Sequence, residues 1–145
     1  MGLRGLRSPA LLVLGALACS SGTDVVTQEP EPATMEVRID GNLALTVNKS
    51  GGTTGPGIRL SLGTPSTLDA TFRNAAGSIV ANNSSDFQLD VTPANAAILQ
   101  FTRTGLLRGQ LTGSSAGSTT VRLSLRHISQ GHDDFPASFL PVLIQ

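Results

Sequence analysis

The chain has 145 residues, with ten basic and ten acidic side chains and therefore no formal net charge. Only 3% of the residues are aromatic and 14% are charged, Trp and Tyr are absent, and Gly, Ser and Thr are abundant. This composition favours a small all-β domain with many turns over a helical bundle, which would contain more Glu, Lys and Leu. It also argues against a nucleic-acid partner, because no basic patch exists to hold a phosphate backbone.

The first 18 residues are typical of a secretory signal peptide. Arg4 and Arg7 form a positively charged start, and residues 10–18 form an apolar segment shorter than the roughly 20 residues needed to cross a bilayer. The segment ends with Gly-Ala-Leu-Ala before Cys19, and small residues before a cysteine resemble the lipobox of bacterial lipoproteins, here with the Leu one place later than usual. The resemblance implies that residues 1–18 are removed and that Cys19 becomes a lipidated N-terminus, which anchors the protein to a membrane. The alternative is an ordinary secretory leader with an incidental cysteine.

Residues 19–33 are expected to form a flexible tether between the anchor and a folded domain. Pro30 and Pro32 stand among acidic residues, and proline prevents regular strand pairing while like charges repel each other. Ser20 follows the cysteine, and by resemblance to the sorting rule of enterobacteria a residue other than Asp at this place implies the outer membrane. In a bacterium with a single membrane, the same anchor would place the protein on the outer face of the plasma membrane.

Residues 34–145 are expected to form one all-β domain. Alternation of apolar and polar residues, the period of a half-buried strand, recurs along the whole segment. It predicts strands at residues 35–40, 43–47, 58–62, 68–73, 87–91, 97–101, 121–126 and 140–144. Residues 48–57 are expected to form a loop, and Pro93, which lacks a backbone donor, is expected to end a strand. About eight to ten short strands without a helix are the pattern of a β-sandwich.

The inward-facing side chains of this alternation supply a predicted core that needs no disulfide, since the chain has a single cysteine. The predicted core residues are Val37, Ile39, Leu45, Leu60, Leu68, Phe72, Phe87, Leu89, Leu99, Phe101, Leu111, Val121, Leu123, Leu125 and Val142. Burial of each apolar side chain contributes about 1.5–3 kcal/mol, so this set is large enough for one domain.

The most specific motif is the stretch from Gly109 to Val121, in which Gly109, Gly113 and Gly117 recur at a spacing of four. Glycine permits positive φ and close backbone approach. Both are expected where a strand ends in a tight turn and the chain continues as the adjacent strand of the same sheet. The stretch resembles the C-terminal signature of the group 2 bacterial immunoglobulin-like domain, Gly-x-[Val/Leu]-Thr-Gly-x-x-x-Gly-x-x-x-[Val/Ile]. This resemblance implies an immunoglobulin-like β-sandwich.

The resemblance extends over about residues 35–126. The run from Leu68 to Val80, a strand followed by an Asn-x-x-Gly-x-x-Val hairpin, is similar to the same group of domains. Beyond residue 126 the chain continues with a further hairpin, which departs from the pattern and ends in the last predicted strand.

One group of residues invites a chemical interpretation: His127, His132, Asp133 and Asp134. His127 continues the buried parity of the strand before it and is expected to point inward. The spacing of His127 and His132 can hold a zinc ion when a loop folds back, and a carboxylate could complete three ligands. The simpler interpretation is that His127 hydrogen-bonds a backbone carbonyl or the carboxylate of Asp133 or Asp134 and so fixes the last hairpin. Because no Cys or third His is at hand to close a metal site, the sequence favours the structural role and keeps Zn²⁺ or Cu²⁺ binding as the alternative.

Catalytic motifs find little support. No Gly-x-Ser-x-Gly elbow occurs, the acidic residues are scattered singly apart from Asp133 and Asp134, and the Gly-rich run at residues 51–55 lacks the Gly-Lys-[Ser/Thr] ending of a P-loop. The Trp and Tyr platforms usual in carbohydrate-binding sandwiches are absent. The sequence therefore predicts a non-catalytic protein without a cofactor.

Taken together, these patterns predict a lipid-anchored cell-envelope protein with a single immunoglobulin-like domain. Its expected role is protein interaction or adhesion, as an accessory module that binds a protein partner in the envelope. An exposed sheet edge could serve such binding, because it presents unpaired backbone groups. The alternative function is that of a small metal-binding envelope lipoprotein that uses His127, His132 and Asp133 or Asp134.

Overall fold

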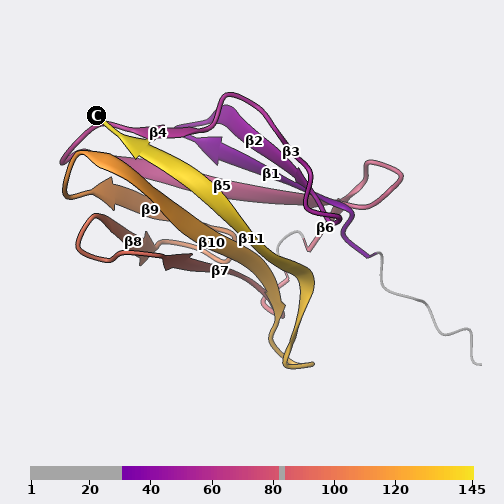
Figure 1. Ribbon diagram of the computed structural model, residues 1–145. Helices are drawn as coiled ribbons and strands as arrows, with labels where there is room; N and C mark the ends of the chain where they lie inside the picture. The colour runs from indigo at the N-terminus through magenta and orange to yellow at the C-terminus, as the bar shows by residue number, and fades with distance from the viewer. Residues whose placement is uncertain (1–30, 82–83) are drawn as a thin grey trace, which may run out of the picture.

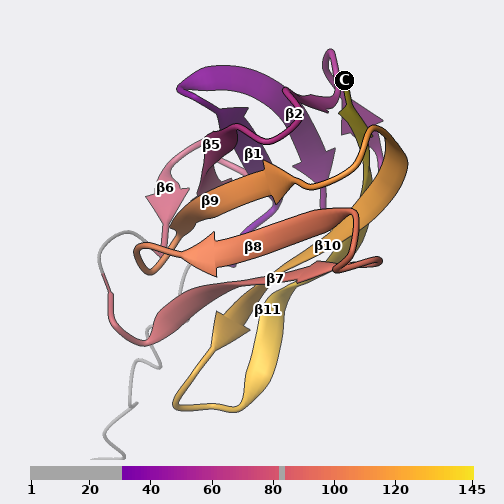
Figure 2. The same cartoon turned by 90° about the vertical axis from the view of Figure 1, so that its left-hand side faces the viewer.

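The computed structural model describes residues 31–81 and 84–145, which form two β-sheets packed against each other as a sandwich (Figures 1 and 2). The strands are β1 (Thr34–Ile39), β2 (Asn42–Asn48), β3 (Thr53–Thr54), β4 (Ile58–Leu60), β5 (Pro65–Arg73), β6 (Ile79–Val80), β7 (Phe87–Pro93), β8 (Leu99–Arg103), β9 (Arg108–Gly113), β10 (Gly117–His127) and β11 (His132–Ile144). The described ranges contain no helix, and so none that is long and apolar enough to span a membrane. The all-β sandwich expected from the sequence is confirmed.

Three of the sequence-based predictions fall wholly or mostly on residues that are not described. The signal peptide at residues 1–18 and the lipidated Cys19 lie outside the described ranges, and so does the tether up to residue 30. Just before β1, the backbone of Ala33 already pairs with the sheet: its N–H donates to the Arg73 carbonyl at 2.7 Å, and its carbonyl accepts from Lys49 at 2.9 Å. The ordered backbone pairing thus starts one residue ahead of Thr34.

The strands divide unequally between the two sheets. The seven-stranded sheet has the order β3-β2-β1-β5-β9-β8, with β6 added to β5. The four-stranded sheet has the order β4-β11-β10-β7, in which β11 runs antiparallel to β10 and parallel to β4. The C-terminal strand, which lies beyond the immunoglobulin-like pattern, is therefore a central strand of its sheet.

One apolar core fills the space between the sheets. All but two of the fifteen predicted core residues are buried. The two exceptions are Phe87 and Phe101, which are partly exposed and pack against the core from its border. Phe135 of β11 is fully buried and meets Phe72 edge to face, with ring centroids 5.6 Å apart. The core thus takes aromatic side chains from both sheets.

The glycine motif works by close approach and by positive φ, as expected from the sequence. A Cβ at Gly109 would overlap the ring of Phe101, and a Cβ at Gly113 would lie 2.5 Å from Cγ2 of Ile144. Gly117 has a φ of +136°. The prediction that the two strands joined by this turn are neighbours in one sheet is wrong, because β9 lies in one sheet and β10 in the other. The turn between them crosses the sandwich, and Gly113 allows the two layers to approach there.

Two further details differ from the sequence-based expectations. The expected loop at residues 48–57 contains the short strand Thr53–Thr54, which pairs with Thr46 and Val47 of β2. The strand β11 carries two register shifts against β10, one of them between Leu125 and Arg126. Strict period-two reasoning cannot anticipate such bulges, because each one inserts a residue and reverses the parity of the strand beyond it.

Candidate functional site

The predicted histidine cluster lies at the turn of the β10–β11 hairpin. His127 ends β10, His132 begins β11, and the two residues are direct cross-strand partners. The turn between them is closed by a hydrogen bond from the Gly131 N–H to the His127 carbonyl at 2.9 Å, with Gly131 at a φ of +72°. Residues directly opposite each other on antiparallel strands share a face, so the hairpin brings both imidazoles to one side of the sheet.

A bulge in β11 adds Asp134 to the same side. Arg126 pairs with Asp133 and Leu125 with Phe135, so Asp134 is the extra residue of the longer strand. Asp134 keeps the parity of His132, while the bulge returns Phe135 to the core side. Both neighbours can therefore face inward, one toward the histidines and one toward the core.

His127 is the centre of the cluster and is buried, with 2% of its surface exposed, as its parity predicts. Its Nε2 lies 2.9 Å from Oδ2 of Asp86, and its Nδ1 lies 3.3 Å from Oδ2 of Asp134. The ring of Phe87 covers it at a centroid distance of 4.5 Å. A buried imidazole between two carboxylates and an aromatic ring is held in one orientation.

Asp134 links the two histidines. Its Oδ1 lies 2.7 Å from Nε2 of His132, while its Oδ2 faces His127. The imidazole rings of His127 and His132 meet edge to face at 5.6 Å. One nitrogen from each histidine and one oxygen of Asp134 all lie within 4.8 Å of one another. Imidazole nitrogens and a carboxylate oxygen are common ligands of zinc and copper.

Asp86 supports the cluster from the neighbouring strand. It stands directly before β7, whose first residue Phe87 pairs with His127. The Ser129 backbone N–H donates to Oδ1 of Asp86 at 2.8 Å, and the Ser129 hydroxyl donates to Oδ2 at 2.7 Å. These two hydrogen bonds, followed by the one from His127, lower the pKa of the Asp86 carboxyl below its usual value. Asp86 therefore faces His127 as an ionised acceptor.

Asp133 does not join the cluster. Its carboxylate lies 3.5 Å from Arg126 and 3.8 Å from Arg122, both on β10. The structure thus brings together three of the four residues that the sequence singles out, namely His127, His132 and Asp134. Asp133 points to the other face of the hairpin, as its alternation with Asp134 requires.

Sequence reasoning missed Asp86 and Ser129. Nothing in the local pattern marks Asp86, which is 41 residues before His127 and reaches it only because β7 pairs with β10. The one weak signal is that Asp86 is an acidic residue directly before a predicted strand. That His127 is the partner of Asp86 can be inferred only when the order of the strands in the sheet is known.

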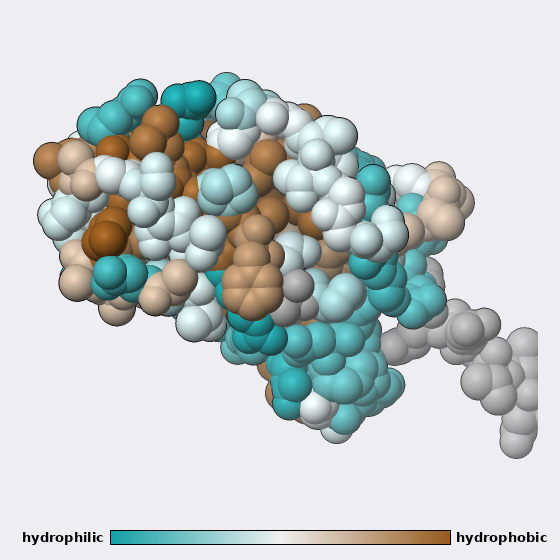
Figure 3. Space-filling model, viewed as in Figure 1, coloured by the Kyte–Doolittle hydropathy of each residue, from teal (hydrophilic) through white to brown (hydrophobic). Residues whose placement is uncertain are grey.

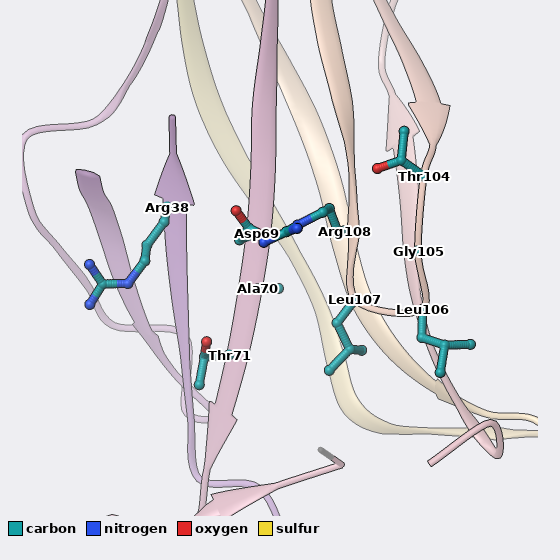
Figure 4. A pocket seen from close by; sticks show the side chains of 9 residues that line it. All are labelled: Arg38, Asp69, Ala70, Thr71, Thr104, Gly105, Leu106, Leu107 and Arg108. Atoms are coloured by element: carbon teal, nitrogen blue, oxygen red, sulfur yellow. The ribbon is translucent and has the colours of Figure 1, made fainter. Parts of the chain in front are cut away.

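A separate open hollow lies on the seven-stranded sheet, beside β1, β5 and the turn before β9. Its volume is about 620 Å³, and its lining is Arg38, Asp69, Ala70, Thr71, Thr104, Gly105, Leu106, Leu107 and Arg108. Figure 4 shows Asp69 and Arg108 pointing toward each other, where they form an ion pair, and Arg38 pointing away. Arg38 pairs with Glu36 instead, so each charged side chain of the lining has a partner within the protein.

The outer face of the four-stranded sheet carries exposed apolar side chains. Phe139 is 70% exposed, and Pro141 and Leu143 follow it on the same side of β11. Figure 3 shows apolar side chains gathered toward the C-terminal end of this face and hydrophilic ones over the β10–β11 turn. Arg122 lies directly opposite Phe139, and Arg59 lies opposite Leu143 on β4. The face is therefore apolar along β11, with arginine on both neighbouring strands.

Comparisons with known proteins find similarity among solved structures. No protein-family model matches the chain, and no curated protein matches it. Among solved structures, the chain is similar to domains 4 and 5 of the S-layer protein SbsC, with 14% sequence identity and a TM-score of 0.45. The match covers 78% of this chain and 53% of that one, so the chain spans about half the length of the S-layer fragment.

Proposed function

We propose that the protein is a non-catalytic, lipid-anchored module of the bacterial cell envelope, with a single immunoglobulin-like domain that binds a protein partner. Three features of the chain support the proposal. The leader ends in small residues before Cys19, the motif from Gly109 to Val121 resembles the group 2 immunoglobulin-like signature, and the two-sheet sandwich provides a rigid body for binding.

The observation that carries the proposal is the exposed Phe139. A phenylalanine that is 70% exposed in the middle of a central strand gains nothing from the core of its own domain. Aromatic residues are enriched at the centres of protein interfaces, where they supply much of the binding energy. Pro141 extends the apolar surface along β11. This face suits a partner that covers it with apolar side chains.

The charges around Phe139 define the partner further. Arg122 and Arg59 stand on the strands to either side of β11; the Arg122 side chain is 41% exposed and lies 3.8 Å from Asp133, which offsets part of its charge. Charge complementarity then favours a partner whose apolar patch is bordered by acidic side chains. A partner of this kind would be steered to the face by the arginines and held there by Phe139.

Site-specific cross-linking tests the binding face. A photo-reactive phenylalanine analogue placed at position 139 in the producing cell should form one discrete adduct, and Arg122→Glu in the same chain should weaken that adduct. The matched control carries the analogue at Leu43, which is 42% exposed on the other sheet and should give no adduct. Equal adducts from both positions, or none from position 139, would contradict the proposal. An adduct of twice the chain's mass would show that the partner is a second copy of this chain and not a different protein.

Fractionation tests the anchor independently. The wild-type protein should be found with the membranes, be released by detergent and take up a labelled fatty acid, and Cys19→Ser should take up none. If the wild-type protein takes up no label, or the serine variant is labelled equally, the lipid anchor at Cys19 is wrong, whatever the cross-linking shows.

A further inference from the structure

We propose that His127, His132 and Asp134 form a binding site for a divalent late transition metal, most suitably Zn²⁺, at the turn of the β10–β11 hairpin. The site lies on the inner side of the hairpin, away from the outer face that carries Phe139. The metal site can therefore be tested independently of the proposed protein partner.

One pair of ligand atoms is already separated as in a zinc site, and the three ligand atoms together lie within 4.8 Å of one another. Two ligand atoms at Zn–N and Zn–O distances of 2.0–2.2 Å and a tetrahedral angle are about 3.3–3.5 Å apart. Nδ1 of His127 and Oδ2 of Asp134 are separated by 3.3 Å. His132 stands 2.7 Å from the other oxygen of Asp134, and its side chain is 53% exposed, so it has room for the small shift that coordination requires.

Asp86 prepares His127 for metal binding. Metal-ligating histidines usually donate their second ring N–H to a carboxylate, which fixes the tautomer and orients the ring. Nε2 of His127 faces Oδ2 of Asp86 at 2.9 Å, and Asp86 is itself held by two hydrogen bonds from Ser129. With the proton on Nε2, Nδ1 is the acceptor nitrogen of the neutral ring, and it is this nitrogen that faces Asp134.

The local charge also favours a cation. In this tautomer, two acceptors, Nδ1 of His127 and Oδ2 of Asp134, face each other at 3.3 Å in a largely buried place. Two acceptors attract each other only through a proton or a metal ion between them. The two carboxylates that flank His127, those of Asp86 and Asp134, together balance a charge of +2. The nearby cations Arg122 and Arg126 are turned to Asp133 on the other face.

Three protein ligands leave one position of a tetrahedral site open. Zinc sites of this kind hold water or another molecule in the fourth position. Because His132 lies at the exposed side of the cluster, that position would be accessible from solvent at the hairpin turn. The bound metal would join β10 to β11, and through Asp86 it would also secure β7.

Zinc binding to the full chain provides the test. All proteins carry Cys19→Ser, so that the single thiol of the chain cannot bind metal, and are kept in detergent, stripped with EDTA and dialysed. At a free Zn²⁺ concentration 100 times the dissociation constant, the melting temperature of the reference protein should rise by roughly 10 °C. Isothermal titration with Zn²⁺ should show one site per chain.

The variants separate metal binding from a structural role. His132→Ala removes an exposed ligand, so its metal-free melting temperature should stay near the reference while its zinc affinity falls by more than about 100-fold. Asp86→Asn should lower the affinity by about 10–100-fold, the usual effect of losing the carboxylate behind a ligating histidine. The matched control is Asp133→Asn, which should bind zinc like the reference.

Three results would overturn the site. The first is a reference protein whose melting temperature does not respond to zinc, which would leave a proton alone between His127 and Asp134. The second is undiminished affinity in His132→Ala. The third is a loss in Asp133→Asn as large as that in His132→Ala, which would point to the carboxylates of the turn rather than to the histidine cluster.

Discussion

At Gly113 the seven-stranded and four-stranded sheets come so close that a single methyl group does not fit. A Cβ there would lie 2.5 Å from Cγ2 of Ile144 and 3.1 Å from its Cδ1. The contact joins β9 to β11 across the core, although the two residues are far apart in sequence. The glycine motif is thus as much a packing motif as a turn motif.

Gly113→Ala should destabilise the domain by about 1–3 kcal/mol through overpacking. Denaturant unfolding of Gly113→Ala, Ile144→Ala and the double variant measures the effect. The double variant should lose less than the sum of the two single losses, because Ile144→Ala vacates the space that the new methyl group needs. The control is Gly105→Ala, whose Cβ would meet its nearest neighbour at an ordinary 3.5 Å. Strict additivity in the double variant would show that the cost at Gly113 has another source.

A second residue-scale prediction concerns Asp86 in the metal-free protein. Its pKa is lowered, mainly by the Ser129 hydroxyl and backbone N–H, so its ionised form is favoured in the folded state. The stability it contributes is fully present above the ordinary carboxyl pKa and is lost as the pH falls through the lowered, folded-state pKa. Ser129→Ala should raise the Asp86 pKa toward its usual value, as measured by the pH dependence of the side-chain carbon resonance in NMR. An unchanged titration would show that the hydroxyl is not the main cause.

The predictability of the candidate site also differs from residue to residue. The inward direction of His127 follows from the alternation of β10, which is local information. The approach of His132 follows from a hairpin with a short turn. Asp86 reaches His127 only through the pairing of β7 with β10, a long-range choice that no local pattern contains. The sequence therefore indicates the ligands of the site but not the carboxylate behind them.

At the scale of the strands, β11 shows how bulges limit what a sequence pattern can predict. Phe135 and Phe139 are four residues apart and would share a face on a regular strand. Phe135 is fully buried, whereas Phe139 is 70% exposed, because a register shift between Leu123 and Leu125 of the partner strand separates them. The alternation predicts the buried positions at the C-terminal end of β11 but not the reversal before them.

The two phenylalanines provide a matched pair of substitutions. Phe135→Ala should cost about 3–5 kcal/mol of unfolding free energy, since it empties a buried site and removes the edge-to-face contact with Phe72. Phe139→Ala should change the stability by less than about 0.5 kcal/mol, the usual range for a surface position. Urea denaturation of both variants measures the difference. Similar losses in both would mean that Phe139 also supports the fold.

At the scale of the whole molecule, the sandwich architecture could be predicted but the assignment of strands to sheets could not. Composition, turn residues and period-two alternation together specify a small all-β domain. They contain no information on the parallel pairing of β4 with β11, which joins residues 58–60 to residues 142–144. The entropic cost of closing a loop rises only slowly with loop length, so it hardly distinguishes one distant partner strand from another. Which distant strands pair therefore depends on how all the strands of the domain compete for partners.

The central place of β11 leads to a prediction for the complete domain. A chain that ends after residue 130 lacks the strand that separates β4 from β10, so it should show no cooperative melting transition. Adding a synthetic peptide of residues 132–145 should restore the transition, since the peptide can enter the vacant place in the sheet. A scrambled peptide is the control. Cooperative melting of the shortened chain alone would contradict the central role of β11.

The position of β11 between β10 and β4 also determines how the domain responds to mechanical force. In Figure 1, β1 starts at one end of the sandwich and the C-terminus lies at the other, so tension between them pulls β11 along its own length. Antiparallel hydrogen bonds run perpendicular to the strands, so this pull loads the bonds to β10 together, in shear. Force applied instead between Ser118 and Leu143, which face each other, would open the same bonds one after another. We expect the first direction to need a markedly higher rupture force at the same loading rate, which would make the domain a stiff link between the proposed membrane anchor and the proposed partner.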